Sequence, residues 1–241
     1  MARAIPERTD EASLDLIGAL WDNTEVFHEL QSCGKDSRQF RSAGRPILRM
    51  PETPPNLILI GFMATGKTTI GRLCATALNF RFRDSDTLVE RRAKRSVSYL
   101  FAHLGEEVFR HMEREAIRDL CRGSRVVIAT GGGAPLFPEN VAHMRKHGVV
   151  ILLTLSEEEI FRRVVNRNTR PLLNQTEDPL KRIHDLLSYR DPLYRQAADV
   201  SVDTCGLCCK ETAEKVLNAY ADCTSKISWI YEHRRPSRKE P

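Results

Sequence analysis

The chain has 241 residues, of which 41% are hydrophobic and 29% charged, and its formal net charge is +5. This length allows one ordinary domain with extensions or two small ones, and the hydrophobic content is enough for a core. No apolar run approaches the roughly 20 residues of a membrane helix, which argues against a membrane partner. The basic residues are dispersed among acids, which argues against nucleic acid and favours small anionic ligands.

The seven cysteines are an odd number at irregular spacings. This pattern is not typical of a disulfide framework, and we expect a reducing, cytoplasmic setting. Cys205, Cys208 and Cys209 are close enough together to suggest zinc. Structural zinc needs four ligands, and no second CxxC or HxxxH pair accompanies the three. We therefore expect free thiols.

Residues 1–55 differ in composition from the rest of the chain. Glu11–Asp22 has apolar residues at helical spacing and predicts a short amphipathic helix. A basic stretch with Gly and Ser then ends in PETPP, a linker composition. A signal peptide would need a longer apolar core, and a transit peptide would lack the acids found here. We expect an N-terminal extension and linker over 1–55, the main domain over 56–223 and a basic tail over 224–241.

The strongest motif of the chain lies in Asn56–Leu78. The apolar run Leu57–Ile60 predicts a buried strand, GxxxxGKT follows from Gly61 to Thr68, and helical spacing then resumes. This order suits a phosphate-binding loop, because backbone N–H groups and the helix dipole then face the anion. In such a loop Lys67 reaches the β- and γ-phosphates and Thr68 ligates Mg²⁺. A chance match in a surface loop is the alternative, and the flanking strand and helix argue against it.

Strands and helices alternate after this loop. We expect strands at Phe80–Arg83, Val126–Ala129, Val149–Leu155 and Val200–Val202. We expect helices at Thr87–Ala93, Ser96–Phe101, Glu106–Leu120, Glu139–His147, after the capping box Ser156-x-x-Glu159, at Lys181–Tyr194 (at least before Pro192) and at Glu211–Ala221. The polar, proline-broken stretch Arg167–Asp178 is a candidate mobile loop. The alternation predicts an α/β fold, a three-layer sandwich with a parallel sheet of about five strands and helices on both faces.

Candidate ligand-binding residues follow the strands directly. Asp84 and Asp86 could serve a metal shell and a substrate hydroxyl, or form a solvated turn. The triple glycine Gly131–Gly133 permits close backbone approach to a ligand, or is a flexible turn. Because ligands collect at the carboxyl ends of parallel strands, these residues should meet the phosphate loop there.

A basic and an acidic residue share one face of a predicted helix. Arg110 and Glu113 are three apart, so the acid can orient the guanidinium. A plain surface ion pair is the alternative.

In order and at comparable intervals, the motifs GFMATGKT, DSD, GEEVFRHMEREA, TGGGA, NTRPLL and YRDPLYRQAAD resemble those of shikimate kinases. The resemblance covers about Asn56–Cys223 and implies a P-loop fold of the nucleoside-monophosphate-kinase type. It implies phosphorylation of the 3-hydroxyl of shikimate, with ATP as co-substrate and Mg²⁺ as cofactor, in aromatic amino acid biosynthesis. It also implies substrate-binding helices over about 86–120 and a lid over about 163–181, and we expect a monomer.

The resemblance assigns roles to residues of this chain. Asp86 orients the attacking hydroxyl or acts as general base, and Arg110 and Arg190 bind the carboxylate of shikimate. Arg170, just before Pro171, is the lid arginine. The implied catalytic residues are Asp86, Lys67 and Arg170, and the implied metal ligands are Thr68 and Asp84. The implied nucleotide-binding residues are Gly61, Ala64, Thr65, Gly66, Lys67, Thr68, Thr69, Arg163 and Arg170. The implied substrate-binding residues are Asp86, Arg110, Gly131, Gly132, Gly133 and Arg190.

Two positions depart from the family pattern. Ala64 stands where the phosphate loop usually has glycine, and CGLC around Leu207 replaces a polar or basic residue beside the adenine. Another small-molecule kinase, such as a gluconate kinase, is the nearest alternative, and the Arg110, Gly132 and Arg190 set argues against it. A non-catalytic nucleotide-binding regulator is the other alternative, and intact Lys67, Thr68, Asp86 and Arg170 argue against that.

Overall fold

The structure is a computed structural model that describes residues 54–165 and 178–233, without the side chains of Val165 and residues 226–233. The predicted helix at Glu11–Asp22, most of the predicted lid, including Arg170, and the end of the basic tail lie outside the described residues. No helix in the described ranges has both the length and the apolar character that a membrane crossing requires.

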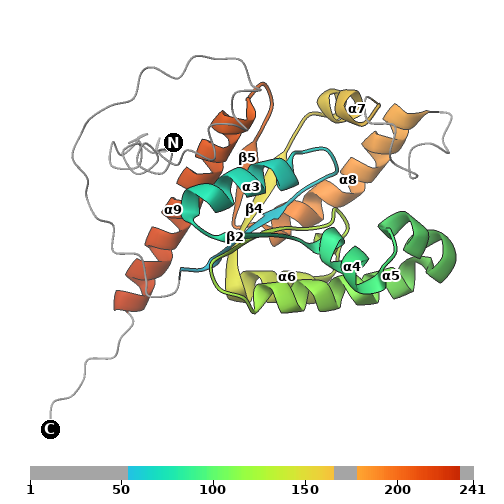
Figure 1. The fold of residues 1–241 in the computed structure, drawn as a ribbon. Coiled ribbons are helices and arrows are strands. Elements are labelled where there is room, and N and C mark those ends of the chain that lie inside the picture. The colour runs from blue at the N-terminus through green and yellow to red at the C-terminus, as the bar shows by residue number, and fades with distance from the viewer. Residues whose placement is uncertain (1–53, 166–177, 234–241) are drawn as a thin grey trace, which may run out of the picture.

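A five-stranded parallel sheet forms the middle layer (Figure 1). Its strands, in the order β2-β3-β1-β4-β5, are β1 (Asn56–Ile60), β2 (Arg81–Asp84), β3 (Val126–Ala129), β4 (Gly148–Thr154) and β5 (Val200–Asp203). The central strand β1 pairs Leu57 with Val127 of β3 and with Val149 of β4. Every residue of β1 is buried, as expected for a strand with helices on both faces. The predicted number and direction of the strands are confirmed.

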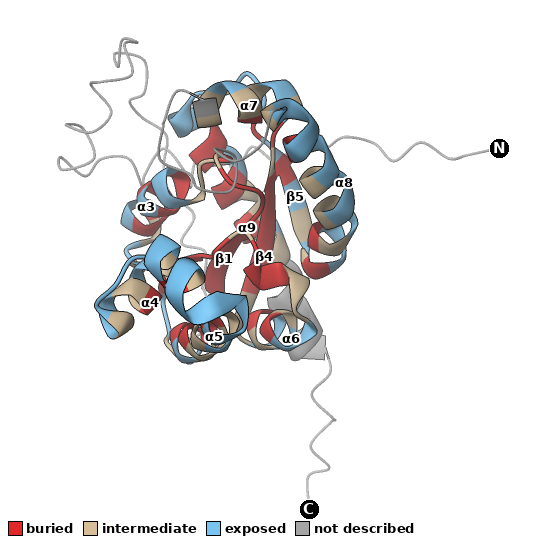
Figure 2. Cartoon of the chain, turned by 90° about the vertical axis from the view of Figure 1, so that its right-hand side faces the viewer, coloured by how far each residue is buried: buried red, intermediate tan, exposed pale blue. Residues whose placement is uncertain are grey.

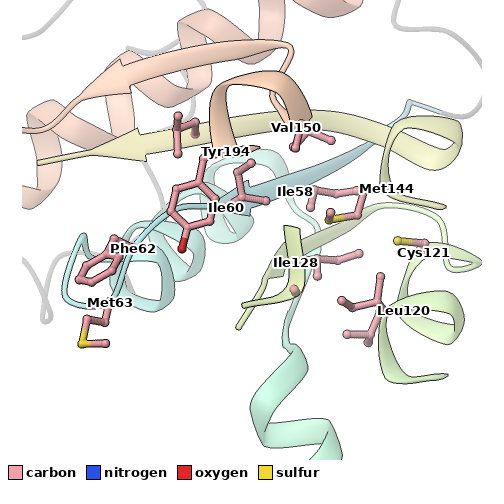
Figure 3. Packing of buried hydrophobic residues seen from close by; sticks show 14 of the residues in the cluster. Ile58, Ile60, Phe62, Met63, Leu120, Cys121, Ile128, Met144, Val150 and Tyr194 are labelled. Carbon is pink, nitrogen blue, oxygen red and sulfur yellow. The ribbon is translucent and has the colours of Figure 1, made fainter. Parts of the chain in front are cut away.

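Helices cover both faces of the sheet (Figure 1). They are α3 (Lys67–Leu78), α4 (Ser85–Ala93), α5 (Val97–Cys121), α6 (Pro138–His147), α7 (Glu157–Val165), α8 (Pro179–Ala197) and α9 (Cys209–His233), with a 3₁₀ turn, η2, at Ala134–Leu136. Leu57 and Leu59 point to a core shared with α3 and α9. Ile58 and Ile60 point to a core shared with α5, α6, α7 and α8 (Figure 3). Figure 2 shows the strands β1 and β4 buried and the outward faces of the helices exposed.

A smaller core lies beside the sheet, where α4 packs on α5. Val89, Leu100, Phe109 and Ala116 form it. Helix α5 contains a break at Gly105, whose φ of 81° and ψ of 165° are not helical. The two helices predicted over Ser96–Leu120 are therefore the two halves of a kinked α5. Phe109 lies in the half that follows the kink.

Two helix boundaries differ from the sequence prediction. The sequence predicted a helix at Lys181–Tyr194, at least before Pro192, and α8 continues through Pro192 to Ala197. Proline removes one N–H donor, and burial of Tyr194 and Ala197 in the core holds the helix together beyond it. The helix predicted at Glu211–Ala221 also ends later than expected, because α9 runs to His233.

Candidate active site

A cleft of about 580 Å³ opens where loops leave the carboxyl ends of β1, β2, β3 and β5. The predicted residues that line it are Ala64, Thr65, Gly66, Lys67, Thr68, Thr69, Asp84, Asp86, Arg110, Gly131, Gly132, Gly133, Arg163 and Arg190. Gly61 begins the phosphate loop, and Arg170 lies outside the described residues. The structure therefore brings the predicted constellation together from six elements of the fold and the loops between them.

The loop after β1 has the shape that phosphate binding needs. Gly61 has a φ of 138°, and a Cβ there would lie 2.5 Å from the carbonyl oxygen of Leu153, so only glycine fits. Lys67 opens α3, and its Nζ donates to the carbonyls of Gly61 at 2.8 Å and Phe62 at 2.7 Å. The ammonium thus lies over the loop, where backbone N–H groups and the helix N-terminus also favour an anion.

Ala64 has a φ of 63°, a left-handed conformation that L-residues other than glycine adopt at some cost. Ala64 therefore replaces the usual glycine of the family at a position where the backbone conformation favours glycine. The carbonyl of Ala64 accepts a hydrogen bond from Nη1 of Arg163 at 3.2 Å. Through this contact, helix α7 holds the phosphate loop in place.

The two predicted metal ligands are in contact. Oγ1 of Thr68 donates to Oδ2 of Asp84 at 3.0 Å. The other oxygen, Oδ1, accepts from the N–H groups of Asp86 at 3.1 Å and Thr87 at 3.3 Å, and so caps α4. One carboxylate oxygen beside a threonine hydroxyl is a set of hard oxygen ligands that suits Mg²⁺.

Two carboxylates converge on Gly131. A Cβ there would lie 2.5 Å from Oδ1 of Asp86 and 2.7 Å from Oε1 of Glu113, so the missing side chain leaves the space that both acids occupy. The N–H of Gly131 donates to Oγ of Ser85 at 2.8 Å, which fixes the glycine. The acids come from α4 and α5, and only the folded chain places them side by side.

Glu113 is 1% exposed, and its Oε1 has no hydrogen-bond partner among the described residues. Burial raises the pKa of Glu113 to about 6, Arg110 acts in the opposite direction, and the charge of Asp86 raises the pKa further. A buried acid that titrates near neutrality in a cleft is typical of a functional site.

The guanidinium of Arg110 is held between two carboxylates. Its Nη1 donates to Oε2 of Glu113 at 2.9 Å, and its Nε and Nη2 donate to Oε1 of Glu106 at 3.1 and 2.9 Å. Burial opposes the charge, but Glu113 and Glu106 outweigh it and the pKa of Arg110 is raised. A Cβ at Gly133 would strike the guanidinium, so this glycine lets Arg110 reach the cleft. The predicted Arg110–Glu113 pair is thus a partly buried network and not a surface ion pair.

Helix α8 contributes Arg190 and Tyr194, which are four residues apart and share a face. The guanidinium carbon of Arg190 lies 5.8 Å from the ring centroid of Phe62. Oη of Tyr194 donates to the carbonyl of Gly132 at 2.5 Å, and burial raises the pKa of Tyr194. Tyr194 was not predicted as a site residue. The signal was its place in YRDPLY, four residues after Arg190, and the sequence alone could not show which carbonyl it meets.

Helix α7 supports the phosphate loop through Glu159. One of its oxygens accepts from Nε of Arg163 at 2.8 Å, and the other accepts from Nε of Arg162 at the same distance. The predicted capping box is therefore only half formed. Oγ of Ser156 accepts from the N–H of Glu159, but the N–H of Ser156 donates to Sγ of Cys205, because the two arginines hold the Glu159 carboxylate.

The glycine loop, its lysine and the Thr68–Asp84 pair at the edge of a parallel sheet define a P-loop phosphotransferase of the α/β class. A family model described as shikimate kinase matches residues 63–221. The shikimate kinase of Caldanaerobacter subterraneus subsp. tengcongensis is 47% identical over 165 residues, covering 68% of this chain and 95% of that protein. The shikimate kinase of Methylococcus capsulatus is 45% identical over 172 residues, covering 71% and 96%.

A solved structure of shikimate kinase from Acinetobacter baumannii, in complex with shikimate, superposes with a TM-score of 0.68 at 36% identity. The superposition covers 71% of this chain and 96% of the Acinetobacter baumannii chain. The chain belongs to the shikimate kinase family. The family expected from the motifs and the expected fold class are both confirmed.

Proposed function

We propose that the chain transfers the γ-phosphoryl group of ATP to the 3-hydroxyl of shikimate, giving shikimate 3-phosphate and ADP. The observation that carries the proposal is Arg110, a guanidinium fork fixed between Glu106 and Glu113 in the cleft of the phosphate loop. An arginine fork binds a carboxylate through two parallel hydrogen bonds. The cleft therefore has a binding site for a hydroxy-acid next to a binding site for a nucleotide.

The nucleotide lies along the phosphate loop in this proposal. Lys67 exchanges its two carbonyl partners for phosphate oxygens, and the loop N–H groups surround the phosphates. Thr68 and Asp84 hold Mg²⁺, which supplies neutralisation of charge on the phosphoryl oxygens. Arg163 fixes the loop at Ala64, and Arg170 closes over the transferred group from the lid, which we place at about 163–181.

The acceptor lies between α5, α8 and the triple glycine. Arg110 and Arg190 bind its carboxylate, and the backbone of Gly131–Gly133 approaches its ring hydroxyls. Asp86 receives the hydrogen bond of the attacking hydroxyl and orients it toward the phosphoryl group. Phosphoryl transfer needs little covalent help from the protein, so positioning and charge neutralisation supply the catalysis.

Several expectations go with this proposal. Residues 1–55 are an extension and linker with no part in the reaction, and the domain ends near Cys223. The enzyme acts as a monomer in the cytoplasm. The irregular cysteine pattern supports a reducing compartment.

The test compares ADP release with shikimate, with gluconate and without an acceptor. Turnover should require shikimate. Gluconate turnover would indicate the related kinase, and binding of ATP without any turnover would indicate a regulator.

Arginine-to-lysine variants test the carboxylate site. Arg110→Lys should raise the KM for shikimate by roughly tenfold to a hundredfold and leave the KM for ATP near the parent value, because lysine cannot reproduce a planar fork. Arg114→Lys, on the exposed side of the same helix, is the matched control and should behave like the parent. A parent-like shikimate KM in Arg110→Lys, or a loss of ATP affinity instead, would contradict the assignment.

A further inference from the structure

The loop between β5 and α9 contains the sequence Cys205-Gly206-Leu207-Cys208. Both cysteines are exposed, and Leu207 between them lines the cleft beside the phosphate loop, as does Cys209 just after them. A CxxC pair at a strand-to-helix junction of an α/β fold is the arrangement of redox-active dithiols.

The backbone turns sharply from Thr204 to Leu207, with Cys205 and Gly206 at the centre of the turn. The N–H of Leu207 donates to the carbonyl of Thr204 at 3.3 Å, and Gly206 has a φ of 70°, which closes the turn. Helix α9 begins directly afterwards, with the N–H of Thr212 bonded to the carbonyl of Cys208. The turn and the helix start hold the two cysteines on one short, solvent-exposed loop.

We propose that Cys205 and Cys208 form a reversible disulfide whose formation weakens nucleotide binding in the adjoining cleft. The second half of this statement rests on the proposed function, and the first half does not. A low-molecular-weight disulfide, such as glutathione disulfide, is the oxidant.

Each sulfur has a separate partner in the reduced protein. Sγ of Cys205 accepts from the N–H of Ser156 at 3.2 Å, and Sγ of Cys208 accepts from the N–H of Glu211 at 3.5 Å. A disulfide bond brings its sulfur atoms to about 2.05 Å from each other. In this proposal, formation of that bond draws Cys205 away from Ser156.

The hydrogen bond that breaks at Cys205 is linked to the phosphate loop. Ser156 is the N-terminal cap of α7, through the N–H of Glu159 at 3.3 Å. The same helix carries Arg163, which donates to the carbonyl of Ala64 in the phosphate loop. Release of Ser156 loosens the start of the helix that holds Ala64, while Leu207 moves in the cleft wall. Both changes fall on the nucleotide end of the cleft and not on the Arg110 end.

The chemistry is a thiol–disulfide exchange in two steps. The thiolate of Cys208 attacks one sulfur of glutathione disulfide, forms a mixed disulfide and releases one glutathione thiolate. Cys205 then loses its proton to solvent, attacks the Cys208 sulfur and releases the second glutathione thiolate. The net change is two protein thiols oxidised and one glutathione disulfide reduced to two glutathione molecules. The hydrogen bond to Asp203 raises the pKa of Cys205, which favours Cys208 as the first nucleophile.

The first measurement is independent of activity. The full-length protein is equilibrated in buffers of increasing glutathione disulfide, alkylated and digested with trypsin. The three cysteines of this region lie on the peptide 196–210. We expect this peptide to carry one alkyl group, on Cys209, and to be two hydrogen atoms lighter than a singly alkylated peptide with two free thiols, with fragments that join Cys205 to Cys208. Dithiothreitol before alkylation should restore the triply alkylated peptide. The proposal is overturned if Cys205 and Cys208 stay reduced, or only one of them is glutathionylated, at every ratio of glutathione disulfide to glutathione. A disulfide to Cys209 also overturns it.

The second measurement locates the effect. Oxidised protein should show a KM for ATP raised roughly threefold to tenfold, the loss expected for about one hydrogen bond, with the shikimate KM at the reduced value. Cys205→Ser and Cys208→Ser should abolish the response, and each serine keeps a hydrogen-bond acceptor. Cys223→Ser, farther along α9, should still respond like the parent. A disulfide that forms without a change in the ATP KM overturns the link to the cleft but leaves the family activity intact.

Discussion

A methyl group added at Gly133 would meet the guanidinium of Arg110, the far end of a flexible side chain. The backbone need not move to relieve this overlap, because Arg110 can turn away. We therefore expect Gly133→Ala to fold with nearly the parent melting temperature. Its KM for shikimate should rise about tenfold, because the fork leaves the carboxylate site, and its KM for ATP should stay constant. Steady-state kinetics with each substrate varied in turn measures this.

Gly148→Ala is the matched control for that variant. A Cβ at Gly148 would lie 2.5 Å from the backbone carbonyl oxygen of Asn56, which cannot turn away. We expect a clear loss of thermal stability with both KM values near the parent's. If Gly133→Ala instead behaved like Gly148→Ala, Arg110 would be part of the packing and could not turn away from the added methyl group.

Glu113 makes stability depend on pH. Its pKa is raised in the folded protein from the ordinary value of 4.5 to about 6, so the folded state binds its proton more tightly than the unfolded state does. The resulting stabilisation is complete below about pH 4.5 and is lost as the pH rises through about 6. A shift of this size corresponds to about 2 kcal/mol.

Replacement by glutamine isolates this effect. The difference in unfolding free energy between parent and Glu113→Gln should change by about 1.5 kcal/mol between pH 4.5 and 6.5, with the parent losing stability relative to the variant. Urea titrations at several pH values measure it. Glu115→Gln removes an exposed carboxylate that pairs with Arg118 on the same helix, and its profile should follow the parent's. A constant difference for Glu113→Gln would mean that Arg110 holds the acid ionised throughout.

Spacing predicted the Arg110–Glu113 contact, because residues three apart on a helix are neighbours whatever the fold. It could not predict that Glu113 is 1% exposed or that it faces Asp86. Those facts depend on how α4 packs against α5 and on a glycine from the loop after β3 between them. The contact between Arg110 and Glu113 could therefore be predicted from the sequence, and the burial and electrostatics of the pair could not.

Among the elements, α5 depends on a single backbone conformation. Gly105 has a φ of 81° and a ψ of 165°, and a Cβ there would meet nothing within 4 Å. The cost of Gly105→Ala is therefore in the backbone alone, about 1–3 kcal/mol for a residue held in a glycine-only region. We expect that loss in the free energy of unfolding by denaturant titration. We also expect a higher shikimate KM, because Phe101 and Arg110 lie on opposite sides of the kink and contact each other. A variant as stable as the parent would show that another conformation satisfies the helix.

Strands and most helices were predictable because burial on both faces leaves continuous apolar runs such as Val126–Ala129. The continuation of α8 through Pro192 was not, because local rules place a helix end at proline. There, core packing of Tyr194 and Ala197 outweighs one missing hydrogen bond. The half-formed capping box failed for a similar reason, since Glu159 has two arginine partners on its own helix.

At the scale of the whole molecule, the described contacts of the domain begin at Pro55. Its carbonyl accepts from Oη of Tyr220 at 2.5 Å, and the side chain of Asn56 bonds Cys121, Gly123 and Val126 across the start of the sheet. Deletion of Met1–Thr53 should therefore leave both KM values and the melting temperature near those of the full chain. A deletion through Asn56 is the paired variant and should lower the melting temperature, because the buried N–H of Val126 loses its partner. Loss of activity in a folded Met1–Thr53 deletion would assign the extension a part in the site.

The strand order has a consequence for synthesis on the ribosome. Among the residues that the structure describes, β1 is the first strand made, yet it occupies the centre of the sheet, and both of its neighbours, β3 and β4, are made later. Until they emerge, the apolar segment Asn56–Ile60 has two unpaired edges. Strand pairings between segments distant in sequence form slowly, and the intermediates that precede them are prone to aggregation. Chaperone dependence should therefore be greatest for nascent chains that end between β1 and β4, and should fall once β4 can pair.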